Sequence, residues 1–382
     1  MQNILIPSQI LYLVVIFTLL LFPKILQRFK IPAPLTCFAL GIGVSLYTTE
    51  FIHDPTIGLL AILGISSLFL FAGLEVDLHE LKKGLGSIVG HLLIRGLLLL
   101  VCIWICMHYF NFSWQVASLL VLALLTPSTG FIMDSLPSLG LSENERFWVT
   151  SKAISGELLA LVLLFVILKS DSYSTLASAS GIILLIAFGL PILLIFLGRY
   201  VIPYAPGSEF SLLIMVGLIA AYLTKQIGVY YLVGAFLTGF VARQLRVKMP
   251  NLASDVNLHA IKLFASFFVP FYFFYSGMTV PSETFVLDAL WLGLIISAIL
   301  IPLRIGSITL QRLLIQKDNI KTASNVSIAL TPTLIFTLVL ATILHERYGI
   351  SEVLFGALLV YAALTTIIPS YLLVKPIKLD LE

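Results

Sequence analysis

Apolar stretches of membrane-spanning length fill the chain almost from end to end, interrupted by charged residues, prolines and glycine clusters. A helix needs about 20 mostly apolar residues to cross the hydrocarbon core of a bilayer. The pattern predicts an all-α polytopic membrane protein, a single membrane domain over residues 1–382 with short loops. About thirteen transmembrane helices are expected, over residues 8–27, 31–48, 56–78, 84–107, 113–139, 144–169, 176–199, 208–225, 228–246, 258–280, 284–316, 320–346 and 349–374.

Lysines and arginines gather on one side of this arrangement. With the N-terminus outside, the cytoplasmic loops and tail hold fifteen of them and the outer loops only three, Lys169, Lys225 and Arg347. Cytoplasmic loops are enriched in these residues. The sequence therefore predicts a multi-pass protein of the cell membrane with its N-terminus outside and its C-terminus in the cytoplasm. The first span lacks a basic flank and a cleavage signal, so we expect a retained helix.

Composition narrows the class of protein. Hydrophobic residues make up 59% and charged residues 11% of the chain, whereas a soluble domain carries about 25% charged residues. A water-soluble enzyme and a single-pass receptor are excluded. The net charge of +3 is too small to indicate a nucleic-acid partner. The three cysteines lie in apolar runs and form no disulfide framework. The expected partner is the lipid bilayer, and no resident cofactor is expected.

Two predicted spans are interrupted by a proline among hydroxyl residues, Thr-Pro-Ser-Thr-Gly at 126–130 and Thr-Pro-Thr at 331–333. Proline removes a backbone donor, and the freed groups need protein or water as partners. A single break would be an ordinary proline kink. Here each break lies in the fifth span of a six-span set, if 176–199 is a linker, and the two sets then have opposite topology. This predicts inverted six-helix repeats with two broken, crossing helices, which is typical of secondary transporters.

The sharpest candidate for chemistry is Glu157, at the middle of span 144–169 and thirty residues after Pro127. Charges at membrane depth are costly and usually functional. The equivalent position of the second repeat is Ala362, so only one repeat supplies a carboxylate. The alternative is a structural carboxylate paired with an arginine.

Two arginines also fall at mid-membrane, Arg95 and Arg304, at near-equivalent positions of the two repeats. The carbonyl ends of half-helices carry partial negative charge, which a buried cation offsets. We therefore expect both arginines to be supporting charges with a structural role. Arg304 could alternatively pair with Glu157.

Three further polar residues lie near these positions. Lys152, five residues before Glu157, is expected to snorkel to the cytoplasmic side. Asp134 would lie in an inward-facing funnel, which Lys152 would share, or at the surface. His91, one turn before Arg95, is expected to be a local hydrogen-bond partner.

Several stretches resemble signatures of the monovalent cation:proton antiporter family, which includes Kef-type potassium-efflux and Nap-type sodium/proton proteins. They are Phe-Leu-Phe-Ala-Gly-Leu-Glu-Val-Asp-Leu at 69–78, Gly-Ala-Phe-Leu-Thr-Gly-Phe-Val-Ala-Arg at 234–243 and the aromatic run at 267–278. The Thr-Pro-Ser-Thr break is also similar, and the resemblance covers essentially the whole chain. It implies a homodimer of thirteen-helix subunits. In each, a core sub-domain (about 84–169 and 284–374) moves against a dimerisation or scaffold sub-domain (about 8–78 and 208–280), with 176–199 as linker.

The resemblance also implies a site. The family carries a carboxylate pair, Asn-Asp or Gln-Asp in the sixth span, and the second member binds cation and proton in turn. Those positions look like Gly156 and Glu157 here, and Arg304 falls where the family has Lys or Arg. This chain departs from the pattern, because Glu replaces the usual Asp and Gly156 has no side chain. Residues 332–335 also lack the charged residues that many members carry after the second break.

These residues together predict a binding site for a monovalent cation and a proton. Alkali cations prefer oxygen ligands, and one carboxylate that holds either ion would enforce antiport by competition. We expect exchange of Na⁺ or K⁺ for H⁺, electroneutral, with about one cation per proton. Three alternatives stay open: a sodium-coupled solute symporter, a channel and a non-transporting regulatory relative. No Walker, zinc or nucleophile motif indicates an enzyme. The expected ligands are Glu157, Ser155, Thr126, Ser128, Thr129 and Thr331.

Overall fold

The computed structural model describes residues 8–47, 51–52, 54–170, 172–228, 231–252 and 254–374. Its regular elements there are helices, and one isolated antiparallel bridge joins Leu139 to Val374. The predicted placement of the two chain ends concerns residues outside these ranges. The α-helices are α1 (Ser8–Gln27), α2 (Ala33–Ser45), α3 (Pro55–Leu74), α4 (Leu78–Lys83), α5 (Leu85–Phe110), α6 (Trp114–Leu125), α7 (Thr129–Ser135), α8 (Glu143–Lys169), α9 (Tyr173–Tyr200), α10 (Glu209–Gln226), α11 (Tyr231–Gln244), α12 (Asp255–Met278), α13 (Leu287–Gln311), α14 (Ile320–Ala329), α15 (Leu334–Tyr348) and α16 (Glu352–Leu372).

Hydropathy and length make this a polytopic membrane protein, as the sequence predicts. Among the described residues, ten helices are long and apolar enough to cross a bilayer, counting residues 114–138 as one. The pair α14 and α15, bent by 43°, adds an eleventh. Helices α2 and α11 are shorter, with 13 and 14 residues. The count of thirteen spans stays a prediction.

Local chemistry sets the position of α8, the helix that carries Glu157. Ser142 and Glu145 form a capping box, in which each side chain receives the other residue's backbone N–H. This arrangement satisfies two of the donors left free at a helix start. The Asn325 side chain donates to Glu145 Oε1 at 2.9 Å, which ties α14 to the same end of α8. The capping residues therefore anchor α8 against the second broken helix.

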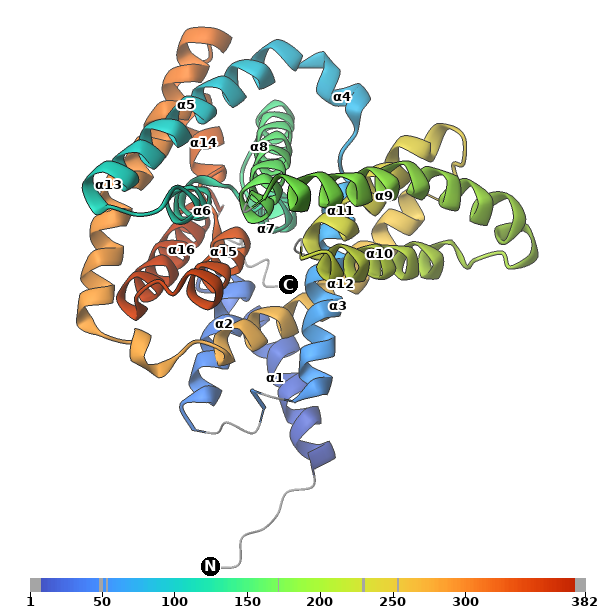
Figure 1. Ribbon diagram of the computed structural model, residues 1–382, viewed down its shortest axis with the longest axis horizontal. Coiled ribbons are helices and arrows are strands. Elements are labelled where there is room, and N and C mark those ends of the chain that lie inside the picture. Colours follow the sequence, from blue (N-terminus) through green and yellow to red (C-terminus); the bar gives the residue numbers. More distant parts are fainter. Residues whose placement is uncertain are drawn as a thin grey trace, which may run out of the picture.

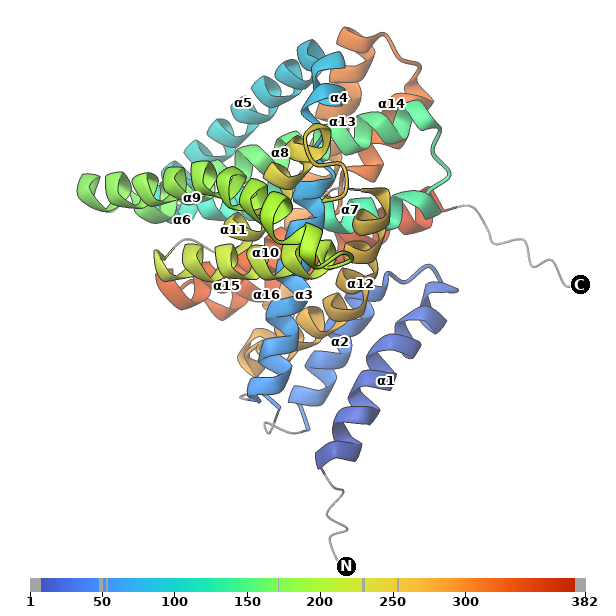
Figure 2. The same ribbon diagram turned by 90° about the vertical axis from the view of Figure 1, so that its right-hand side faces the viewer.

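The helices gather in two groups (Figure 1). In one group α13 packs on α16, α15 on α6 and α16, and both α5 and α14 on α8. In the other, α3 packs on α11 and α12, α12 on α2, and α10 on α11. Figure 2 shows α1 at the edge of the second group, beside α2. The long helix α9 contacts α8 on one side and α10 and α11 on the other.

Glycines let α3 and α11 approach until their backbones touch. A methyl group added at Gly239 of α11 would overlap the carbonyl oxygen of Leu70, and one added at Gly73 of α3 would overlap that of Phe236. Backbone atoms cannot give way as the end of a flexible side chain can. Small residues at such interfaces are typical of membrane helix packing.

We expect Gly239→Ala to destabilise the protein by about 1–3 kcal/mol, the usual cost of overpacking. The matched control is Gly58→Ala in α3, where an added methyl group meets no atom within 4 Å. Thermal unfolding in detergent should show a lower melting temperature for Gly239→Ala only. Equal melting temperatures for the two variants would contradict the close contact.

Candidate functional site

The two proline breaks lie against each other and complete each other's backbone hydrogen bonds. The N–H of Ser128 donates to the carbonyl of Pro332 at 2.8 Å. The Ser128 hydroxyl accepts the N–H groups of Ile335 and Phe336, at 3.0 and 3.3 Å. Unwound backbone survives at membrane depth only when protein or water satisfies it. The two breaks therefore form one structural unit between α6–α7 and α14–α15.

Arg304 of α13 binds the carbonyl end of α14. Its Nη1 donates to Thr331 O at 2.9 Å and to the Tyr361 hydroxyl at 3.0 Å, and its Nη2 donates to Leu330 O at 3.0 Å. The Tyr361 hydroxyl donates in turn to Leu124 O at 2.6 Å, so it links this arginine to α6. The guanidinium thus satisfies carbonyls that have no partner inside their own helix. These are the contacts that a supporting charge requires.

Arg95 of α5 binds a carbonyl at the first break, as Arg304 does at the second. Its Nη2 donates to the carbonyl of Leu125, the last residue of α6, at 3.1 Å. Both arginines are buried. In the described part of the chain, no ion pair within 4.0 Å joins either of them to Glu157.

Glu157 lies on α8 and is 2% exposed. Its Oε2 accepts the backbone N–H of Thr129, the first residue of α7, at 3.1 Å. Arg95 is close enough for a direct electrostatic interaction with the same carboxylate. A carboxylate that receives one N–H bond and has a cation nearby keeps lone pairs free for a proton or a metal ion. The geometry thus places a buried acid directly at the first break.

The hydroxyl residues predicted around Glu157 differ in their hydrogen bonds. Ser155 donates to a carbonyl within α8, and Thr331 donates to carbonyls of its own helix end and of α16. Ser128 is held by the backbone of α15. The Thr126 hydroxyl is buried and has no hydrogen-bond partner, while the Thr129 hydroxyl interacts with the Glu157 carboxylate. Because buried polar atoms are almost always paired, the Thr126 oxygen is free to serve a ligand, and the Thr129 oxygen lies beside the carboxylate.

Lys152 does not snorkel, and it is not part of a funnel. The side chain is 0% exposed, and its Nζ donates to Gln311 Oε1 of α13 at 3.0 Å. Nδ1 of His91 lies 3.3 Å from the same oxygen. The expectation for Lys152 is wrong because the side chain of Gln311, on α13, offers the lysine amino group an acceptor inside the protein. His91 has its hydrogen-bond contact there too, rather than with Arg95.

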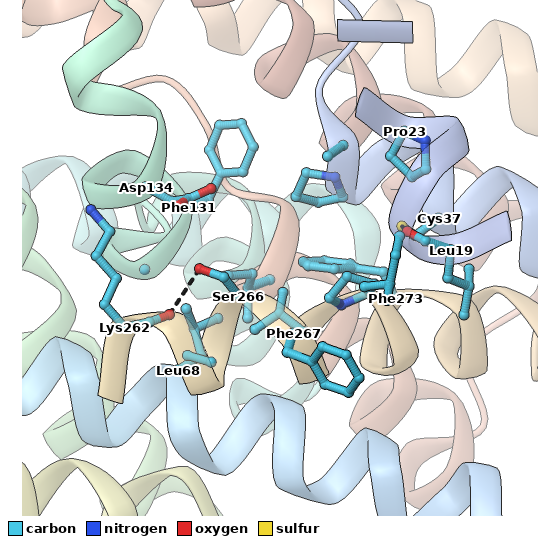
Figure 3. A pocket seen from close by; sticks show the side chains of 18 of the residues that line it. Leu19, Pro23, Cys37, Leu68, Phe131, Asp134, Lys262, Ser266, Phe267 and Phe273 are labelled. Atoms are coloured by element: carbon cyan, nitrogen blue, oxygen red, sulfur yellow. Dashed lines mark hydrogen bonds between the residues drawn. The ribbon is translucent and has the colours of Figure 1, made fainter. Parts of the chain in front are cut away.

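A cavity of about 430 Å³ lies between α7 and the helices α1, α2 and α12 (Figure 3). Asp134 of α7 lines it, and the Lys262 side chain extends from α12 toward α7 on the opposite wall. The cavity also touches Gly130, next to Thr129 in the chain. Asp134 is exposed to this space, so a cation in the cavity can approach the first turn of α7.

Sequence reasoning missed Lys262, Tyr361 and Gln311. Each is a polar residue inside a predicted span, and this alone could have marked it as a candidate. Tyr361 contacts Arg304, 57 residues away, and Leu124, 237 residues away, and Gln311 contacts Lys152, 159 residues away. No local pattern could have named these partners.

Comparison with known proteins identifies the family and the fold. A sequence profile of the family described as "Sodium/hydrogen exchanger, transmembrane" matches residues 13–377. "Probable Na(+)/H(+) antiporter 3" of Methanocaldococcus jannaschii is 26% identical over 373 residues, 94% of this chain and 93% of the relative. Two solved structures of the sodium proton antiporter MjNhaP1 from the same organism share the fold. The structure at pH 8 has a TM-score of 0.66, 14% identity and 96% coverage of both chains. The other, an electron-microscopy structure, has a TM-score of 0.62, 19% identity and coverage of 96% and 94%.

Proposed function

Since this chain belongs to the sodium/hydrogen exchanger family, we propose that it exchanges a monovalent cation, Na⁺ or K⁺, for H⁺ by alternating access. The observation that carries the proposal is Glu157, a buried carboxylate that accepts the backbone N–H of Thr129 at the break of a helix. A proton and a cation cannot both occupy one carboxylate. Competition between them couples the two fluxes, with about one cation per proton and no net charge moved.

The arrangement of helices supports a finer architecture. Adding α2 and α11 to the eleven candidate spans gives thirteen, with α6–α7 and α14–α15 as the two broken helices. Helices α5–α8 and α13–α16 form the core sub-domain, α1–α3 and α10–α12 the scaffold sub-domain, and α9 the linker. A homodimer in the cell membrane, with the N-terminus outside, completes this proposal.

The cavity gives the cation a route to the site in this conformation. It lies between the core helix α7 and scaffold helices, and the buried residues Gly130 and Ile335 line it. Lys24, near the end of α1, also lines it, and the excess of such residues in the predicted cytoplasmic loops makes this the cytoplasmic side. Movement of the core against the scaffold would close this cavity and open the opposite side.

Purified protein in liposomes with a trapped pH-sensitive dye tests the proposed exchange. Addition of Na⁺, K⁺ or Li⁺ in turn should evoke proton movement with at least one of them, unchanged when valinomycin and K⁺ set the membrane potential. Proton movement driven by the potential would contradict electroneutral exchange. Folded protein that moves no protons with any cation would contradict the proposed function itself.

Asp134 should attract the cation into the cavity without binding it at the ion site. We expect Asp134→Asn to raise the KM for the cation by about two- to fivefold at low salt, with an unchanged maximal rate, because a charge lining a cleft concentrates counter-ions. The effect should shrink at about 0.15 M ionic strength, where exposed charges are screened. Glu283→Gln, at an exposed carboxylate outside the cavity, is the control. A lost maximal rate in Asp134→Asn would place this carboxylate in the ion site.

A further inference from the structure

Gly156 leaves a space that the guanidinium of Arg95 fills. A methyl group added at Gly156 would overlap Nη1 of Arg95 and lie only 3.0 Å from its Cζ, and the ring of Pro127 would follow at 3.6 Å. Gly156 directly precedes Glu157 on α8, whereas Arg95 comes from α5. The absence of a side chain at this position therefore brings a permanent cation to the ion site.

The charges around Glu157 are mostly positive. Arg95 interacts with the carboxylate from α5, and Arg304 of α13 lies within electrostatic reach of Arg95. On α8 itself, Lys152 is buried five residues away and contacts α13. His91 of α5 lies against Gln311, the residue of α13 that Lys152 contacts. The helix α7 contributes the backbone N–H of Thr129 and, farther along, Asp134, which faces the cavity instead.

We propose that Gly156 and Arg95 act as a pair that sets the affinity of the ion site. The glycine admits a fixed guanidinium beside Glu157, and this charge weakens the binding of the transported cation and of the proton alike. Arg95 is thus an affinity-setting residue in addition to its bond to Leu125 O. This inference rests on the proposed exchange at Glu157.

The size of the effect follows from electrostatics. Two unit charges several ångströms apart in a protein interact strongly enough to change a binding constant by about one to two factors of ten. Both ions carry one positive charge, so the guanidinium repels both equally. Where protons do not compete, its removal lowers the KM for the cation. Where protons saturate the site, its removal strengthens the binding of the proton and of the cation by the same factor, so the KM for the cation stays the same.

The guanidinium has room to withdraw. A small cavity of about 30 Å³ adjoins Arg95 and is also lined by His91, Arg304 and Gln311. Nη1 is the far end of a flexible side chain, so a methyl group at position 156 can displace it without moving a backbone. Gly156→Ala therefore disturbs the structure less than removal of the arginine does, because that removal would also leave Leu125 O without its partner.

The test compares the KM for the cation in proteoliposomes at alkaline and at acidic pH. Gly156→Ala and Arg95→Gln should each lower the KM about tenfold at alkaline pH and leave it unchanged at acidic pH. The double variant should show no larger change than either single variant. Gly96→Ala, next to Arg95 on α5 and free of any atom within 4 Å, is the matched control and should behave as the wild type. Thermal stabilisation by the same cation at alkaline pH gives a second readout that needs no transport.

An unchanged or raised alkaline KM in folded Gly156→Ala would overturn the inference and leave the proposed exchange intact. An equal fall in KM at both pH values would also overturn it, since a general change in packing would then suffice. Wild-type protein that neither exchanges protons nor is stabilised by any cation would overturn both the inference and the proposed function.

Discussion

Replacing Glu157 by glutamine is expected to abolish cation-evoked proton movement, down to the level of protein-free liposomes. Glutamine has nearly the same shape, and its carbonyl oxygen can still accept the N–H of Thr129, a bond that measures 3.1 Å to the native carboxylate. The amide neither takes up a proton nor offers a negative charge to a cation. The variant should therefore fold but bind neither the proton nor the cation. The dye assay, with size-exclusion chromatography as the check of folding, measures this.

The control for this experiment is Glu143→Gln, at the exposed start of the same helix α8. It removes the same charge from the same helix and should leave the exchange unchanged. Proton movement that survives in folded Glu157→Gln would show that another group carries the proton.

Reversal of the charge at Arg304 is expected to prevent folding. The change removes donors to Leu330 O, Thr331 O and the Tyr361 hydroxyl. Each hydrogen bond from a charged group contributes about 1.5–3 kcal/mol. A carboxylate in place of the guanidinium would also repel the carbonyl oxygens that the guanidinium binds. The summed loss is comparable to the whole stability of a typical protein, about 5–15 kcal/mol. Arg304→Glu should therefore give no monodisperse protein in detergent, and Arg304→Lys a reduced yield with a lower melting temperature.

Arg246→Glu is the matched control, because Arg246 forms an exposed ion pair with Asp255 at 2.9 Å. Exposed pairs contribute at most about 1 kcal/mol, so this variant should fold with a normal yield. If Arg304→Glu instead reached the wild-type yield and melting temperature but lost transport, Arg304 would act on the ion rather than on the helix end.

The fold class could be predicted from the sequence because its signals are local. Apolar stretches of membrane length marked the helices, and the prolines at 127 and 332 fell in the breaks between α6 and α7 and between α14 and α15. Each such signal lies within a few residues of the feature it predicts. The structure added that Ser128 joins the two breaks through hydrogen bonds across more than two hundred residues of chain.

The candidate site was predicted only in part, because its remaining features depend on packing between distant helices. Glu157 was conspicuous as a carboxylate at the middle of an apolar span. The position of Arg95 beside Gly156 depends on how α5 crosses α8, which no local pattern encodes. Lys152 was misplaced for the same reason, since Gln311 lies 159 residues further along the chain. A polar residue in a span can thus be recognised, but its partner cannot.

Proton release on cation binding tests the central claim most directly. Detergent-purified protein in weakly buffered solution, at a pH where Glu157 is still protonated, would receive Na⁺ or K⁺ while a pH electrode or dye follows free protons. One carboxylate that holds either ion predicts about one proton released per cation bound, and none from Glu157→Gln. Saturable cation binding with no proton released from the wild-type protein would contradict exchange by competition at this carboxylate.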